Sequence, residues 1–160
     1  MVKILIVYDS KTGNTEKMAF AVAEGVKRVK NVEVTVKKVD KTSLEDLCSS
    51  DGIIMGSPTY YGQMSGRLKT LIDESVKIHG KLEGKVGAAF TSSGGTASGA
   101  ETTLLSILQA MLVHGMIVQG RPDDKHYGAA AVDPTSEKDI AYCKELGKRV
   151  ANLVAKLKAQ

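Results

Sequence analysis

Two kinds of segment alternate along the whole of this sequence. Short apolar runs rich in β-branched residues, typical of strands buried on both faces, alternate with stretches whose apolar residues recur at helical spacing. The first pair is the run Val2–Tyr8, followed by an amphipathic pattern from Asn14 to about Lys30. Because strands separated by helices become parallel neighbours in one sheet, this alternation restricts the chain to an α/β fold.

Four further pairs of strand and helix follow the first. The pattern predicts strands at Val32–Val39, Gly52–Ser57, Lys85–Phe90 and Met116–Val118. It predicts helices that begin after Ser43 and Ser65, helices over Glu101–Val113 and Ser136–Lys158, and a polar loop from about Gly120 to Pro134. Since no linker interrupts the series, we expect a single domain over residues 1–160. Its expected architecture is three αβα layers around a doubly wound, five-stranded parallel sheet in the order 2-1-3-4-5.

Ligands of such a sheet bind beyond the carboxyl ends of its strands, near the switch point between strands 1 and 3. The loop after the first strand is Ser10-Lys11-Thr12-Gly13-Asn14-Thr15. It combines three hydroxyls with successive backbone N–H groups at a helix N-terminus, which suits a phosphate monoester. It matches neither the Walker pattern nor GxGxxG. The alternative interpretation is an ordinary helix cap with a glycine turn.

Two further loops are expected at the same edge of the sheet. Pro58-Thr59-Tyr60-Tyr61-Gly62 follows the third strand, and its two aromatic rings are suited to stacking on a flat heterocycle. Ser92-Ser93-Gly94-Gly95-Thr96-Ala97 follows the fourth strand, and its amides and hydroxyls suit the ring edge or sugar of a nucleotide. Each loop has a structural alternative: a turn with surface tyrosines in the first case, and a flexible connector in the second.

Composition excludes several other classes. The formal net charge is +4, but only 4% of residues are aromatic, so we expect no nucleic acid partner. The basic residues near Lys27–Lys41 are interpreted as a solvated helix end and strand edge. No segment approaches the roughly 18 apolar residues of a membrane span, and we expect a cytoplasmic protein without stable membrane insertion. Cys48 and Cys143 are too far apart for a metal or CxxC centre, and we expect buried free thiols.

Several of these segments together resemble one protein family over nearly the whole chain. Ser10–Thr15 resembles the phosphate loop of flavodoxins, and Ser57–Gly66 resembles flavodoxin-like NAD(P)H:quinone oxidoreductases of the Trp-repressor-binding-protein (WrbA) type. Ser92–Gly95 with the following Glu101-Thr102-Thr103 is similar to that family's third FMN loop. Further segments that match the family are His114-Gly115-Met116 and Tyr127-Gly128-Ala129.

The resemblance implies a flavodoxin-like fold that binds FMN without covalent attachment. By this resemblance Ser10–Thr15 hold the phosphate, Pro58–Gly62 lie along the isoalloxazine, and Ser92–Ala97 meet the ribityl chain and ring edge. His114 would sit near the flavin as the best candidate for a proton donor. The alternative for His114 is a histidine at a helix C-terminus, favoured by the helix dipole. His79 and His126 are interpreted as surface residues, and the family's habit predicts a homodimer or homotetramer.

Two functions are compatible with these features. The leading hypothesis is an FMN-dependent enzyme that transfers two electrons from NAD(P)H through the flavin to a quinone. The alternative is a flavodoxin-type one-electron carrier, which Thr12 and the compact length favour and the positive net charge disfavours. The segment Glu74–Gly84 is shorter than in the longer relatives and has no Trp, and in those enzymes a Trp there helps wall the substrate pocket. A non-enzymatic interaction domain remains a third possibility.

Overall fold

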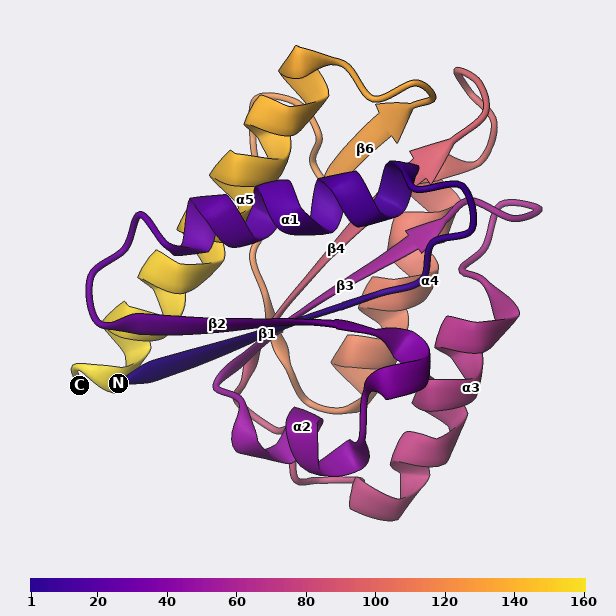
Figure 1. Cartoon of the computed structure of the whole chain (residues 1–160). Coiled ribbons are helices and arrows are strands. Elements are labelled where there is room, and N and C mark those ends of the chain that lie inside the picture. Colours follow the sequence, from indigo (N-terminus) through magenta and orange to yellow (C-terminus); the bar gives the residue numbers. More distant parts are fainter.

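The computed structural model describes all of residues 1–160 and shows a twisted parallel sheet with helices on both faces (Figure 1). The strand order is β2-β1-β3-β4-β5, which confirms the predicted order. The strands are β1 Val2–Tyr8, β2 Val32–Lys38, β3 Gly52–Pro58, β4 Val86–Ser93, β5 Ile117–Val118 and β6 Ala129–Val132. Because every pairing is parallel, the carboxyl ends of β1, β3 and β4 lie along one edge of the sheet.

Helices α1 and α5 cover one face of the sheet, and α2, α3 and α4 cover the other (Figure 1). The helices are α1 Asn14–Val26, α2 Leu44–Ser49, α3 Gly66–Glu74, α4 Ala100–Val113 and α5 Glu137–Lys158, with 3-10 turns η1 Val39–Lys41 and η2 Ser75–Ile78. The predicted caps are present, since Ser43 accepts from the Asp46 N–H and Ser65 accepts from the Leu68 N–H. None of the helices combines the length and the apolar composition that a membrane-spanning helix needs.

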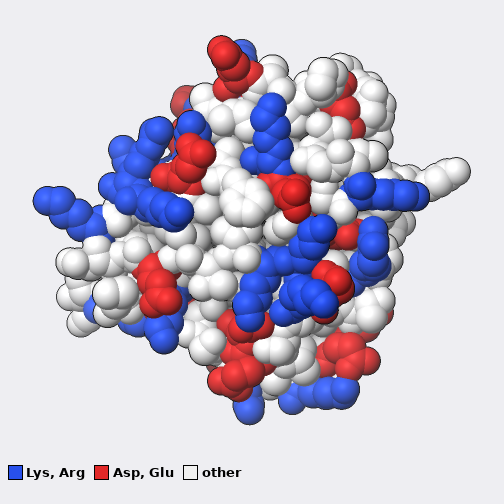
Figure 2. All heavy atoms as spheres, viewed as in Figure 1, with Lys and Arg blue, Asp and Glu red and all other residues white.

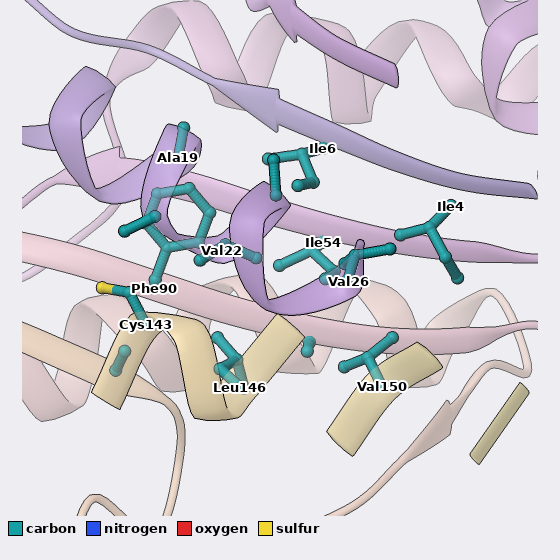
Figure 3. Close-up of a cluster of buried hydrophobic side chains, with 14 of the residues drawn as sticks. Ile4, Ile6, Ala19, Val22, Val26, Ile54, Phe90, Cys143, Leu146 and Val150 are labelled. Atoms are coloured by element: carbon teal, nitrogen blue, oxygen red, sulfur yellow. The ribbon is translucent and has the colours of Figure 1, made fainter. Parts of the chain in front are cut away.

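The pleat of β1 divides the apolar side chains between two cores. Ile4 and Ile6 belong to the cluster under α1 and α5, whereas Leu5 and Val7 belong to the cluster under the other helices. Figure 3 shows the first cluster, in which Val22 of α1 and Leu146 of α5 lie close to Phe90 of β4. The sheet is therefore buried on both faces, as the continuous apolar runs predicted.

The predicted loop from Gly120 to Pro134 was wrong over Ala129–Val132. These residues form β6, which pairs with the end of β4 at Phe90–Ser93, while β5 pairs with its beginning at Val86–Gly87. Two short strands thus share the sheet edge where a single fifth strand was expected. Small side chains explain the omission, because a run of three alanines lacks the β-branched residues that mark strands.

Two element boundaries and the burial of one cysteine also differ from the prediction. β4 continues beyond Phe90 to Ser93, because its polar end pairs with β3 on one side and with β6 on the other. α1 ends at Val26, and the basic residues that follow it form a turn. Cys143 is buried as expected, but Cys48 is only half-buried because it lies on the short peripheral helix α2.

Candidate functional site

The three predicted loops meet at the carboxyl edge of the sheet. The Thr15 and Ser92 hydroxyls lie 2.9 Å apart and join the start of α1 to the end of β4. The Thr59 N–H donates to the Ser92 carbonyl (2.8 Å), and the Thr59 hydroxyl lies 2.8 Å from that of Thr91. We call residues 10–15 loop 1, residues 58–63 loop 2 and residues 92–99 loop 3, and together they form the three-loop site.

Loop 1 ends on a helix N-terminus that no side chain caps. Gly13 is the N-cap of α1 and has a left-handed conformation (φ +100°). No side chain makes a capping hydrogen bond at this end of the helix. Its own N–H donates to the Ser10 hydroxyl (3.2 Å), which closes the loop beneath the helix. By contrast, serines cap α2, α3 and α5. The first turn of α1 therefore keeps N–H groups for an anion, and a Cβ built on Gly13 meets nothing within 4 Å.

Loop 2 forms a tight two-residue turn that presents aromatic rings. The Tyr60 N–H donates to the Gln63 carbonyl (3.0 Å), and the Gln63 N–H donates to the Tyr60 carbonyl (3.1 Å). Tyr61 and Gly62 both have positive φ (51° and 73°), the geometry of a type I′ turn. Tyr61 is fully exposed and Tyr60 is 41% exposed. A tyrosine held in this uncommon conformation with its ring in solvent is suited to contacting a ligand.

Loop 3 begins inside the sheet and then becomes exposed. Ser92 and Ser93 are buried strand residues, and the Ser93 hydroxyl donates to the Gly95 carbonyl (3.0 Å). Beyond them the loop consists of small residues and contains no aromatic side chain. It touches loop 2 closely, because a Cβ on Gly99 would lie 2.6 Å from the Gly62 Cα. Only backbone and small hydroxyl groups therefore line this side of the three-loop site.

His114 does not lie at the three-loop site. It is the C-cap residue of α4, and the 14 residues of this helix carry the chain about 21 Å back from loop 3. Its Nε2 atom lies 2.7 Å from the Ser75 hydroxyl, and its ring centroid lies 5.7 Å from that of His79. Burial lowers the pKa of His114, and the neighbouring His79 adds to this effect. Within one chain, the structure thus does not bring His114 to the three-loop site, because helices that follow parallel strands end at the opposite edge.

The other two histidines, His79 and His126, are exposed as predicted. Sequence reasoning missed two carboxylates at the edge of the three-loop site. Asp9, the last residue before loop 1, is 4% exposed and pairs with Arg67 at the start of α3 (Nε–Oδ1 3.2 Å). Asp133 follows β6, and its N–H donates to the Ser93 carbonyl (2.8 Å). Burial raises the pKa of Asp133, and a hydrogen bond from Asn14 acts in the opposite direction.

A charged residue at the end of a buried strand was the available signal for Asp9. Nothing in the sequence near Asp133 indicated that β6 would bring this residue beside Asn14.

Comparisons with known proteins agree on one family. Residues 2–123 match the model of the NADPH-dependent FMN reductase family. A flavodoxin of Aquifex aeolicus (strain VF5) is 40% identical, covering 97% of this chain and 88% of the relative. An NAD(P)H dehydrogenase (quinone) of Archaeoglobus fulgidus is 39% identical, covering 98% of this chain and all of the relative (100%). The solved structure of a flavodoxin, WrbA-like protein from Agrobacterium tumefaciens superposes with a TM-score of 0.85 at 28% identity, covering 98% of this chain and 99% of that chain.

Proposed function

The chain belongs to the NADPH-dependent FMN reductase family, and from that premise we propose that it transfers two electrons from NAD(P)H through FMN to a quinone. It is a flavodoxin-like oxidoreductase of the WrbA type, and FMN is its cofactor. Its relatives carry two names, flavodoxin and NAD(P)H dehydrogenase (quinone), which correspond to a carrier and an enzyme. Of these two roles, we propose the enzyme.

The residues of the three-loop site fit FMN. The uncapped start of α1 and the open space at Gly13 suit a phosphate group. The exposed rings of Tyr60 and Tyr61 suit the isoalloxazine, and the amides of loop 3 suit its edge. Each loop therefore supplies the kind of contact that one part of this cofactor needs.

One observation carries the proposal of an enzyme. Among the three loops, only loop 2 carries aromatic side chains, while loop 3 offers small residues from Gly94 to Ser98, all exposed except the half-buried Gly95. A flat cofactor that stacks on the tyrosines would then keep one face free of aromatic cover. An uncovered face admits a second planar molecule, as a nicotinamide or a quinone requires.

The protein's part in the reaction is binding and orientation. Bound FMN supplies hydride acceptance and donation. Tyr60 and Tyr61 would set the plane in which the cofactor and the second ring meet. Loops 1, 2 and 3 contain no His, Asp, Glu or Cys, and His114 lies at the far edge of the sheet. We therefore infer that the protons that the quinone needs come from solvent, either directly or through the hydroxyls of Tyr60 and Tyr61.

The second candidate is a one-electron carrier of the flavodoxin type. A relative named flavodoxin is 40% identical over nearly the whole chain, which supports this candidate. Surface charge opposes it, since carriers of this type dock through an acidic surface. Figure 2 shows Lys and Arg side chains spread over the face formed by α1 and β2, with Asp and Glu between them. Basic side chains also pair with acidic ones, as Lys37 of β2 does with Asp46 (2.8 Å) and Lys144 of α5 does with Glu24 (2.8 Å).

Anaerobic turnover separates the two candidates. Purified protein with added FMN would be mixed with NADH or NADPH, and nicotinamide oxidation followed with and without benzoquinone. Fast oxidation that requires both protein and quinone supports the enzyme. Bound flavin that neither nicotinamide can reduce supports the carrier instead. The homodimer or homotetramer and the cytoplasmic location stay predictions, which sedimentation and cell fractionation would test.

A further inference from the structure

A buried carboxylate lies next to the phosphate loop. Asp9 follows β1 and directly precedes loop 1, and its side chain continues the alternation that turns Leu5 and Val7 toward the α3 face. Only 4% of its surface is exposed. Ser10 and Lys11, which follow it, are polar loop residues, but the Asp9 side chain itself lies inside the molecule. The chain therefore keeps an acidic group at the edge where an FMN phosphate would bind.

One cation lies within ion-pair distance of this carboxylate. The Arg67 Nε atom is 3.2 Å from Asp9 Oδ1 and 3.3 Å from Oδ2, so it lies between both oxygens. Arg67 is the second residue of α3, the helix that follows loop 2, and its side chain is 61% exposed. The pair thus joins residues 58 positions apart, one beside loop 1 and one beyond loop 2.

An unpaired carboxylate at this place would oppose phosphate binding. A phosphate monoester carries about −1.5 to −2 charges at pH 7, and a buried carboxylate beside it would repel it because solvent screens a buried charge poorly. The remaining charges of loop 1 and the first turn of α1 are Lys11, Glu16 and Lys17. Glu16 accepts a hydrogen bond from Tyr8 (2.6 Å) and lies 3.9 Å from Lys38. Arg67 is the only residue that forms an ion pair with Asp9.

We propose that Arg67 is a positioning residue for FMN, which acts by neutralising Asp9 beside the phosphate loop. Arg67 would act on the cofactor only through Asp9. Once the charge of Asp9 is neutralised, the N-terminus of α1 and the hydroxyls of loop 1 would dominate the electrostatic field at the phosphate. The inference rests on the FMN site of the proposed function. It adds a residue outside all three loops whose removal weakens affinity for FMN through another side chain.

The test is a double-mutant cycle of Arg67 and Asp9. The affinity for FMN is measured for each variant by the quenching of flavin fluorescence on binding. Arg67→Met should weaken FMN binding by about tenfold, since it leaves the buried charge of Asp9 without a partner. Asp9→Asn should tighten binding by about threefold, because it removes the negative charge and leaves Arg67 in place. The double variant should bind FMN within about threefold of the parent protein. Lys69→Met is the matched control, since Lys69 is on the same helix but pairs with Asp73 (2.6 Å).

Three results would overturn the inference: an unchanged affinity in Arg67→Met, a double variant as weak as Arg67→Met, or an equal loss in Lys69→Met. Circular dichroism of each variant shows whether it is folded. If Arg67→Met does not fold, Asp9→Asn decides alone, and weaker FMN binding by this variant contradicts the inference. A parent protein that does not bind FMN would contradict the proposed function itself. If the parent binds FMN and the variants bind it with the same affinity, only the role of Arg67 is contradicted.

Discussion

At the scale of the residue, left-handed backbone conformations gather at the candidate site. Gly13, Gly62 and Gly99 have positive φ, and so do two of the four such non-glycine residues, Tyr61 and Ala97. Conformations of this kind cost free energy for an L-residue with a side chain. Their presence on all three loops indicates that the loops are shaped for contact with a ligand, and glycine is required at the first of them.

Gly13→Val is expected to weaken FMN binding by at least about tenfold, because a β-branched residue would distort a loop held at φ +100°. The fold should survive, since the new Cβ meets no neighbour within 4 Å. Gly80→Val is the matched control, because Gly80 also has positive φ (88°) and open surroundings but lies beyond η2. Equal FMN affinities of the two variants, measured by fluorescence titration, would contradict the assignment of loop 1.

Tyr61→Ala should lower FMN affinity by about two- to twelvefold, the loss expected for one aromatic stack of about 0.5–1.5 kcal/mol. The free energy of unfolding should change by less than about 0.5 kcal/mol, because the ring is fully exposed. Urea unfolding without FMN and flavin titration measure the two quantities separately. Tyr127→Ala serves as the control, since Tyr127 is also exposed but precedes β6 and belongs to none of the three loops. A loss of stability without a loss of affinity would show that Tyr61 is structural.

At the scale of the element, two glycines set how closely α1 and α5 approach. A Cβ on Gly25 would lie 1.9 Å from the Lys144 carbonyl oxygen, and a Cβ on Gly147 would lie 2.0 Å from that of Val22. Each helix thus presents a glycine to the backbone of the other, and the two pack directly against each other over the sheet. Helical periodicity identifies the apolar faces of these helices, but it does not show that their backbones touch.

Gly25→Ala should therefore destabilise the protein by about 1–3 kcal/mol, although alanine is the better helix former. The cost arises because the backbones of α1 and α5 must separate to admit the methyl group. Gly66→Ala is the matched control, since Gly66 is also helical and its Cβ would meet nothing within 4 Å. This control should be neutral or slightly stabilising. Chemical unfolding of both variants provides the measurement, and equal effects would rule out the close crossing.

At the scale of the whole molecule, the core under α1 and α5 keeps two ionisable groups away from water. Burial raises the pKa of the Cys143 thiol from 9.0 to about 12, the charge of Asp139 adds to this effect, and that of Lys125 opposes it. Burial also raises the pKa of Tyr8 from 10.0 to about 12, supported by the hydrogen bond to Glu16. In both cases the folded state keeps a proton that the unfolded state releases. Stability from these groups is therefore complete below about pH 9 and is lost as pH rises toward 12.

We expect the free energy of unfolding to fall by about 2 kcal/mol or more between pH 8 and pH 10.5, with Cys143 as the largest contributor. Urea unfolding across this range measures the decline. Cys143→Ala should be less stable at pH 8, because it leaves a small cavity, but its stability should fall less steeply with pH. Parallel curves for the parent and this variant would show that the thiol does not ionise on unfolding in this range.

Much of this protein follows from local sequence patterns. Apolar runs such as Val2–Tyr8, separated by helical periodicity, predicted the parallel sheet and its order, because burial on both faces is visible in the sequence. The topology rule then predicted the edge at which loops 1, 2 and 3 meet. Loop chemistry and the family resemblance together predicted FMN as the cofactor.

The tertiary structure decided the features that depend on distant residues. β6 exists because the end of β4 offers backbone groups to pair, and nothing within Ala129–Val132 indicates this partner. His114 matched a family segment, but the direction of α4 carries it to the opposite edge of the sheet. Asp9 and Arg67 meet across 58 positions, since the fold brings the end of β1 beside the start of α3. Periodicity is a local property of the sequence, whereas pairing of charges and strand edges depends on how the elements are arranged in space.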